Sequence, residues 1–180
     1  MKKYFLIVFL SVFSICFAQL TIKDTLIENT KYTVAEFNST KTFLLNNNID
    51  FKIVEDNHIV SWLIDETVAL DVMFGKLNID DVKDEDRDLI FEMEDEETKD
   101  VLFSKKIKAT IDKHPAFYKQ VVEKLDKEYY VEASYNIFAP KRIIRLQMMY
   151  KVGTEKELVE SVEGIIPVFQ EYVKTGVFIR

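Results

Sequence analysis

The sequence predicts an α+β domain, with an antiparallel sheet of about five to six strands and helices packed on one face of that sheet. Three observations lead to this fold class. Several short segments alternate apolar and polar residues, as half-buried strands do, and others repeat apolar residues every three or four positions, as helices do. The 180 residues are 48% hydrophobic and 31% charged, with 4 Gly and 3 Pro, which is the balance of one compact folded domain.

Residues 1–18 have the organisation of a cleavable secretory signal peptide. Two lysines follow Met1, an apolar run comes next, and Ala18 is a small residue of the kind that signal peptidase accepts. A membrane-spanning helix needs about 20 apolar residues, and the polar sequence from Thr21 onward ends the run too early for that. We therefore expect cleavage after Ala18. The alternatives are an uncleaved anchor and a lipid attached to Cys16.

Cleavage sets the expected location and chemistry of the mature chain. Residues 19–180 would form a single α+β domain, periplasmic or secreted, with no transmembrane segment. Cys16 is the only cysteine, so the mature domain would have no thiol for a nucleophile, a zinc thiolate or an iron–sulfur cluster. The formal charge of −7 becomes −9 once Lys2 and Lys3 are removed. Such an acidic domain is not expected to bind nucleic acid.

The elements expected up to residue 74 are an entry strand, a helix and three strands. Thr21–Ile27 alternates as a strand does. Thr33 and Glu36 have the spacing of a capping box, and the apolar residues after them predict a helix that ends at Leu45. Period-two alternation then predicts antiparallel strands, over 49–53, 58–64 and 68–74.

The middle of the chain is expected to contain one short strand and two helices. Leu89–Met93 is the strand, between acidic segments. Phe103, Ile107 and Ile111 recur every four residues and predict a helix. His114 and Pro115 interrupt that pattern, so a second helix is expected to begin there.

The last third predicts a long hairpin and a closing helix. Apolar residues alternate over Tyr129–Val152, on both sides of a turn. Thr154 and Glu157 form a second capping box, and a long amphipathic helix follows. Gly164 and Pro167 lie inside that helix and predict a kink or a break.

This element order, over residues 34–175, resembles the type III secretion chaperone-like fold. The resemblance implies a protein-binding or dimerising module rather than an enzyme. The secretion chaperones themselves act in the cytoplasm, so the export signal is a departure from that family.

An acidic stretch over residues 80–100 suggests calcium. Its aspartates have the offsets of an EF-hand loop, in which oxygens converge around the ion: Asp84, Asp86, Asp88 and Asp95. Leu89 stands where that loop needs glycine, and Asp95 replaces the bidentate glutamate. A looser calcium site and a solvated acidic loop are the alternatives. Calcium is the only cofactor that the sequence suggests.

No catalytic residue is identified. His58 and His114 have no third metal ligand or adjacent nucleophile at a useful spacing, and no serine lies in a Gly-x-Ser-x-Gly turn. Six lysines make the segment after the acidic stretch basic: Lys105, Lys106, Lys108, Lys113, Lys119 and Lys124. A solvated helix face, a polyanion-binding face and attraction to the preceding acids are all interpretations of this segment.

Four aromatic residues are the interface candidates: Trp62, Tyr130, Tyr135 and Tyr150. Core packing is the alternative for each. The sequence as a whole favours an exported, non-enzymatic binding or protein-interaction module of unknown partner, with a homodimer as one form. A carboxylate-dependent hydrolase and a calcium-dependent module are the alternative functions.

Overall fold

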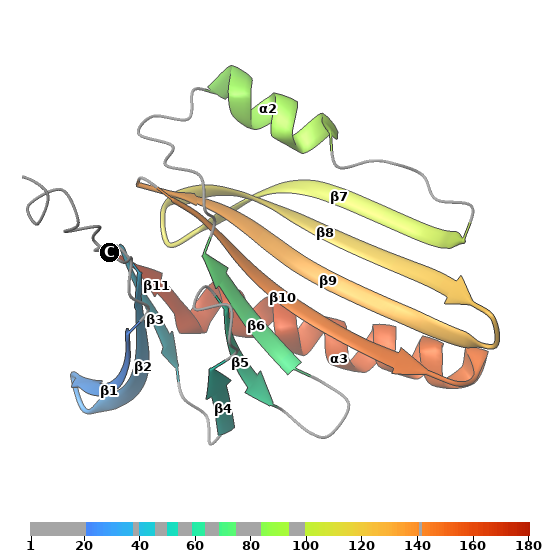
Figure 1. Cartoon of the computed structure of the whole chain (residues 1–180), viewed down its shortest axis with the longest axis horizontal. Coiled ribbons are helices and arrows are strands. Elements are labelled where there is room, and N and C mark those ends of the chain that lie inside the picture. Colours follow the sequence, from blue (N-terminus) through green and yellow to red (C-terminus); the bar gives the residue numbers. More distant parts are fainter. Residues whose placement is uncertain are drawn as a thin grey trace, which may run out of the picture.

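The computed structural model (Figure 1) describes residues 21–37, 40–45, 50–53, 59–63, 69–74, 84–93, 100–140 and 142–180. Its elements, in chain order, are β1 (Thr21–Ile27), β2 (Thr30–Phe37), β3 (Thr40–Leu45), β4 (Asp50–Ile53), β5 (Ile59–Leu63), β6 (Ala69–Phe74), α2 (Asp84–Met93), β7 (Val101–Ile111), β8 (His114–Leu125), β9 (Glu128–Ala139), β10 (Arg142–Val152), α3 (Glu155–Gly176) and β11 (Val177–Ile179).

The described strands form two sheets in which all paired strands are antiparallel. One sheet has four strands in the order β1-β2-β3-β11, and the other has seven in the order β4-β5-β6-β10-β9-β8-β7. The prediction of an antiparallel α+β fold is confirmed. The prediction of one sheet of five to six strands is wrong, because the first three strands and the last one pair apart from the rest.

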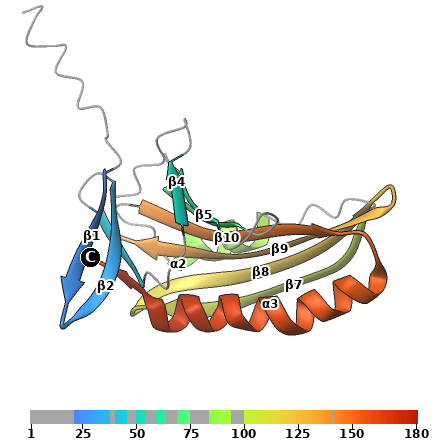
Figure 2. The ribbon, with the colours of Figure 1, turned by 90° about the horizontal axis from the view of Figure 1, so that it is seen from below.

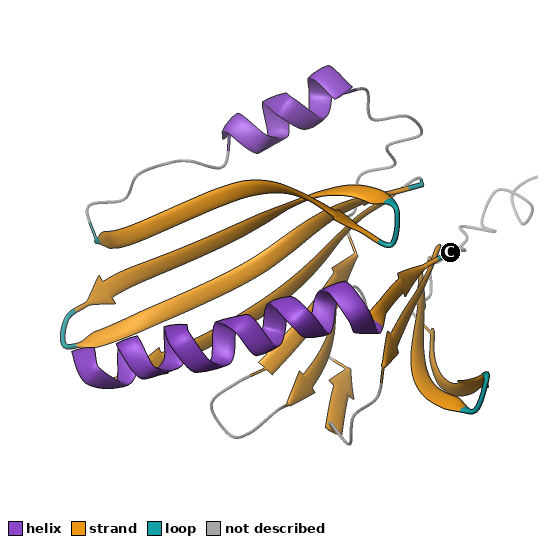
Figure 3. Cartoon of the chain, turned by 180° about the vertical axis from the view of Figure 1, so that it is seen from behind, coloured by secondary structure: helices purple, strands orange, loops and turns teal. Residues whose placement is uncertain are grey.

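Helix α3 covers one face of the seven-stranded sheet, in front of its strands when the chain is seen from behind (Figure 3) and along their length when it is seen from below (Figure 2). The predicted capping box is confirmed: Thr154 Oγ1 accepts from the backbone N–H of Glu157 at 3.2 Å, and the Glu157 carboxylate accepts from that of Thr154 at 3.0 Å. Phe169 of this helix packs against Tyr135, with ring centroids 5.9 Å apart. Tyr135 in turn contacts Tyr118, so these rings belong to the core beneath α3.

Helix α2 lies on the opposite face of the same sheet. Its Phe91 ring meets Phe117 edge-on, with centroids 5.6 Å apart. Phe117 and Tyr118 are adjacent in β8, and consecutive side chains of a strand point to opposite faces. Because Tyr118 belongs to the α3 side, the prediction that the helices share one face is wrong.

A single buried cluster includes residues of both sheets. Ala35 and Leu44 contribute from β2 and β3, and Val177 and Ile179 contribute from β11. The C-terminal strand pairs with β3, and the backbone N–H of Arg180 donates to Lys41 at 2.7 Å. The end of the chain therefore attaches the smaller sheet to the core under α3.

Residues 33–45, expected to be helical, form strands β2 and β3 instead. Thr33 is fully buried and donates to the Asp24 carboxylate across the β1–β2 pair at 3.1 Å, so it does not cap a helix. Thr40, Thr42 and Leu44 alternate on the buried side of β3. The segment is rich in β-branched residues, which favour strands, and this preference outweighs the helical spacing of its apolar residues.

The two helices expected over residues 103–125 are the long strands β7 and β8, and the short strand expected at Leu89–Met93 is part of helix α2. In β8 the predicted helix start, His114, is the first residue of the strand. The resemblance to the type III secretion chaperone-like fold was based on the expected order of helices and strands. The observed order differs from it at these segments. The hairpins over β4–β6 and β9–β10 are confirmed, with Tyr129 paired to Val152.

Helix α3 is continuous from Glu155 to Gly176, so the expected break at Gly164 and Pro167 is absent from it. Both residues lie on the exposed side of the helix, as does Glu163. Pro167 leaves the carbonyl of Glu163 without its helical donor, and an exposed carbonyl can bond to water instead. Neither described helix is long and apolar enough to cross a bilayer.

Candidate functional site

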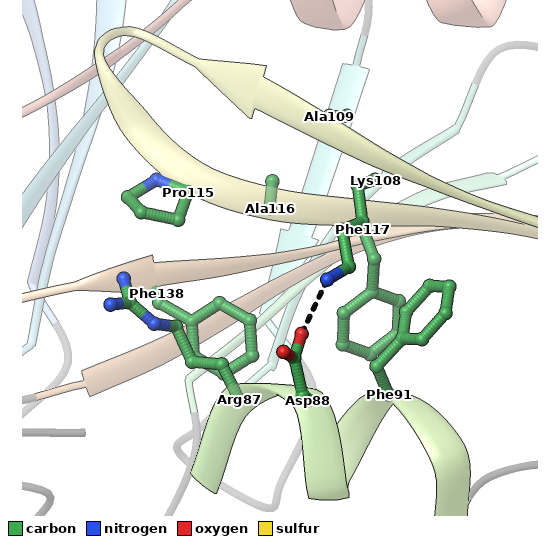
Figure 4. Close-up of a pocket in the computed structure, with 9 residues that line it drawn as sticks. All are labelled: Arg87, Asp88, Phe91, Lys108, Ala109, Pro115, Ala116, Phe117 and Phe138. Atoms are coloured by element: carbon green, nitrogen blue, oxygen red, sulfur yellow. Dashed lines mark hydrogen bonds and ion pairs between the residues drawn. The ribbon is translucent and has the colours of Figure 1, made fainter. Parts of the chain in front are cut away.

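A cavity of about 310 Å³ lies between α2 and the face of the sheet opposite α3 (Figure 4). We call it the α2 cavity. Its lining comes from α2, β7, β8 and β9, and consists of Arg87, Asp88, Phe91, Lys108, Ala109, Pro115, Ala116, Phe117 and Phe138. Ligand pockets usually measure roughly 300–1,000 Å³, so the volume suits a small ligand.

Strand alternation and register determine which side chains of the sheet face this cavity. Lys108 pairs with Phe117, Phe117 pairs with Asn136, and Asn136 pairs with Arg145, in one row across β7, β8, β9 and β10. Paired residues share a face of the sheet. Phe138 lies two residues beyond Asn136 on the same face, and its ring centroid is 6.0 Å from that of Phe117.

Aromatic and charged contacts hold α2 on this face. The Phe91 ring contacts two lysines of β7, with Lys106 Nζ 4.6 Å and Lys108 Nζ 5.8 Å from its centroid. Lys108 also donates to the Asp88 carboxylate at 2.5 Å. This ion pair joins the acidic stretch to the basic segment, as one interpretation of those lysines anticipated. Both partners are more than half exposed, so we expect it to orient α2 more than to stabilise it.

The sheet beneath α2 is basic in an acidic protein. The row described above contains two cations, Lys108 and Arg145. The neighbouring row across the same strands contains two more, Lys106 and Lys119, and neither row contains a carboxylate. Glu132, in a further row, accepts from the guanidinium of Arg145. The face toward the α2 cavity therefore has a positive excess, although the whole chain has a formal charge of −7.

Polar side chains are buried on the same face. Ser134, Asn136 and Gln147 are at most 5% exposed. Nδ2 of Asn136 and Nε of Arg145 are buried donors on this face that have no hydrogen-bond partner among the described residues. A buried donor without an acceptor lowers stability by about 1–3 kcal/mol. Asn136 and Arg145 are therefore the place on this face where an added hydrogen-bond acceptor would be most favourable.

Two of the predicted interface residues are core residues instead. Tyr135 is 2% exposed and Tyr150 is 6% exposed, both under α3. Burial raises the pKa of each phenol to about 12. The prediction that they alternate along the hairpin strands was correct, but the face on which they lie is covered by α3. Tyr130 is half-buried on the cavity face and donates to Glu128 at 3.1 Å. Trp62 is in β5, and its side chain lies outside the described residues.

The predicted calcium ligands divide between α2 and a segment outside the described residues. Asp84, Asp86 and Asp88 are in the helix, and Asp95 lies outside the described part. The EF-hand offsets bring oxygens together only on a loop backbone, and here Asp88 bonds to Lys108. Within the described ranges, no group of three or more metal-ligating side chains comes together.

The six lysines of the basic segment do not form a single surface. Lys106, Lys108 and Lys119 share the cavity face, whereas Lys105 and Lys124 have the opposite parity in β7 and β8, and Lys113 is in the turn between these strands. His58 lies outside the described residues. The sequence analysis missed the phenylalanines of the cavity and Asn136, because only the pairing of β7, β8 and β9 brings them together.

The chain matches no family model, and no curated protein sequence matches it.

Proposed function

We propose that this chain is an exported, non-enzymatic binding module that holds a small ligand with an apolar body in the α2 cavity. The observation that carries the proposal is the wall of three phenyl rings, Phe91, Phe117 and Phe138, around a cavity of about 310 Å³. Apolar and aromatic walls with a few placed polar groups are typical of small-molecule sites. Contact with such rings favours an aliphatic or aromatic ligand body.

The polar lining favours binding over hydrolysis. Asp88 is the one carboxylate among the described lining residues, and it is ion-paired with Lys108. Hydrolysis of the glycosidase kind uses two carboxylates that flank the bond to be cleaved. A general base also needs a free proton acceptor within reach of the substrate, and an ion-paired carboxylate is a poor one.

Titration calorimetry with decanoate and decanol tests this function. We expect saturable binding of one alkyl chain per protein, weakened about tenfold by Phe91→Ala, because a lost aromatic contact of about 1.4 kcal/mol corresponds to a factor of ten. The matched control is Leu89→Ala on the same helix, since Leu89 is 54% exposed. Its affinity should equal that of the unaltered protein.

Two results would overturn the proposal. The first is no saturable binding of either probe by the unaltered protein. The second is equal affinity of Phe91→Ala and Leu89→Ala while circular dichroism shows both folded.

Export is the second part of the proposal, and it is supported by the composition of residues 1–18. Protein recovered from its own host is expected to begin at Gln19, which intact-mass measurement determines. Recovery from inside the cell with Met1 retained would contradict it.

A further inference from the structure

We infer that the ligand of the α2 cavity is an amphiphilic monocarboxylate whose head group is bound by Asn136 and Arg145. The inference rests on the proposed binding function and specifies the chemical class of the ligand. It starts from the two buried donors without partners, Nδ2 of Asn136 and Nε of Arg145.

These donors are adjacent. Asn136 and Arg145 are direct register partners in β9 and β10, so their side chains leave the sheet on the same face. Asn136 is 5% exposed, so solvent reaches very little of its amide. The donors also adjoin the aromatic wall, because Asn136 pairs with Phe117 and lies two residues from Phe138. Neither donor is among the residues that line the α2 cavity, so a ligand whose body lies against those rings has to extend its head group beyond the lining to reach them.

The donors require an acceptor. One end of the Arg145 guanidinium is already bonded to Glu132, through Nη2, while Nε has no partner within the described ranges. A carboxylate offers two acceptor oxygens, so it can satisfy an amide N–H and a guanidinium N–H together.

The surrounding charge selects an anion over a neutral or cationic head. Lys106, Lys108, Lys119 and Arg145 lie in two adjacent rows on the side of the sheet to which α2 binds. Two acids on this side are ion-paired, Asp88 with Lys108 and Glu132 with Arg145. Helix α2 also carries Asp84, Glu85, Asp86 and Glu92, so the positive excess belongs to the sheet and not to the helix above it. A cationic head would meet this positive excess and lose affinity.

A series of probes with one alkyl chain and different heads tests the inference: decanoate, decanol and decyltrimethylammonium. We expect decanoate to bind at least tenfold more tightly than decanol, and the cation to bind more weakly than either. Equal affinity of decanoate and decanol would overturn the carboxylate while leaving the binding function intact. Failure of all three to bind would instead contradict the binding function itself.

The variant that tests the head-group residues is Asn136→Leu. It removes the donor and keeps a similar volume, so we expect about tenfold weaker decanoate binding, unchanged decanol binding and no loss of thermal stability. The matched control is Thr42→Val, because Thr42 is buried and its hydroxyl has no partner in the described part of the chain, but it lies in the smaller sheet. It should leave both affinities unchanged.

Equal weakening of decanoate and decanol by Asn136→Leu would overturn the assignment, because it would mean that Asn136 only shapes the cavity. If Asn136→Leu does not fold, Asn136→Asp replaces it. The aspartate has the same size and repels an anion, so decanoate affinity should fall more than tenfold. Unchanged decanoate affinity in that variant would likewise overturn the assignment.

Discussion

Deletion of residues 177–180 is expected to abolish the folded state. Val177 is 1% exposed and Ile179 is 3% exposed, and both belong to the cluster that includes residues of both sheets. Removing a large buried aliphatic side chain costs about 2–5 kcal/mol. Two such losses reach the whole stability of a typical domain, about 5–15 kcal/mol.

The deletion also removes polar contacts that join distant parts of the chain. The backbone N–H of Ile179 donates to the Asp112 carboxylate at 2.7 Å, and Asp112 lies in the β7–β8 turn. The backbone bond from Arg180 to Lys41, at 2.7 Å, is lost as well. After the deletion, β3 becomes an edge strand, with part of its backbone unpaired.

Urea unfolding followed by circular dichroism measures the effect. The graded variants are Ile179→Ala, expected to lower the free energy of unfolding by about 2–4 kcal/mol, and Phe178→Ala. Phe178 is half-buried on the other face of β11, where it meets Tyr32 edge-on, so its loss should cost less. A deletion that keeps a cooperative transition within about 1 kcal/mol of the intact protein would show that β11 is dispensable.

Phe169→Ala is expected to lower the free energy of unfolding by about 3–5 kcal/mol. The ring is 4% exposed and contacts Tyr135, so its removal leaves a void at the centre of the α3–sheet interface. Neighbouring side chains fill such a void only in part, and the lost contacts add to the lost burial.

The control for this variant is the adjacent residue. Val168 is 69% exposed, so Val168→Ala removes little buried area, and alanine has the higher helix propensity. Its stability should stay within about 0.5 kcal/mol of the unaltered protein, measured by thermal and urea unfolding. Comparable losses in both variants would mean that α3 is stabilised as a helix rather than by docking on the sheet.

Elements with local signals could be predicted from the sequence. The β9–β10 hairpin was correct because alternation over Tyr129–Val152 extends for many residues on both sides of one turn. The start of α3 was correct because the capping box uses only Thr154 and Glu157 and their own backbone. Such signals need no partner from elsewhere in the chain.

The spacing of apolar residues in β7 was ambiguous. Phe103, Ile107 and Ile111 recur every four residues, which is close to one helical turn and equals two periods of a strand. Pairing with β8 resolves the ambiguity, since Ile107 faces Tyr118 and Ile111 faces His114 across an antiparallel ladder. Hydrogen bonds to a neighbouring strand are a tertiary property, and periodicity alone does not contain them.

The candidate site was the part least accessible to sequence reasoning. Asp88 was noticed for its acidic surroundings, but its partner Lys108 is 20 residues away. Asn136 was not singled out: it alternates with the apolar residues of the hairpin, yet it is 5% exposed. Alternation alone assigns such a residue to solvent, and only the tertiary structure shows that it is buried.

The sequence by itself determined the class of the fold, antiparallel strands with a long C-terminal helix. Strand alternation and helix capping depend only on residues that are close together in the sequence. The tertiary structure decided that the strands divide into two sheets, that β11 pairs with β3, and that α2 borders a cavity on the face opposite α3. The physical reason is that burial and strand pairing depend on contacts between residues far apart in the chain. A local pattern shows which residues can be buried together, but it does not show what covers them.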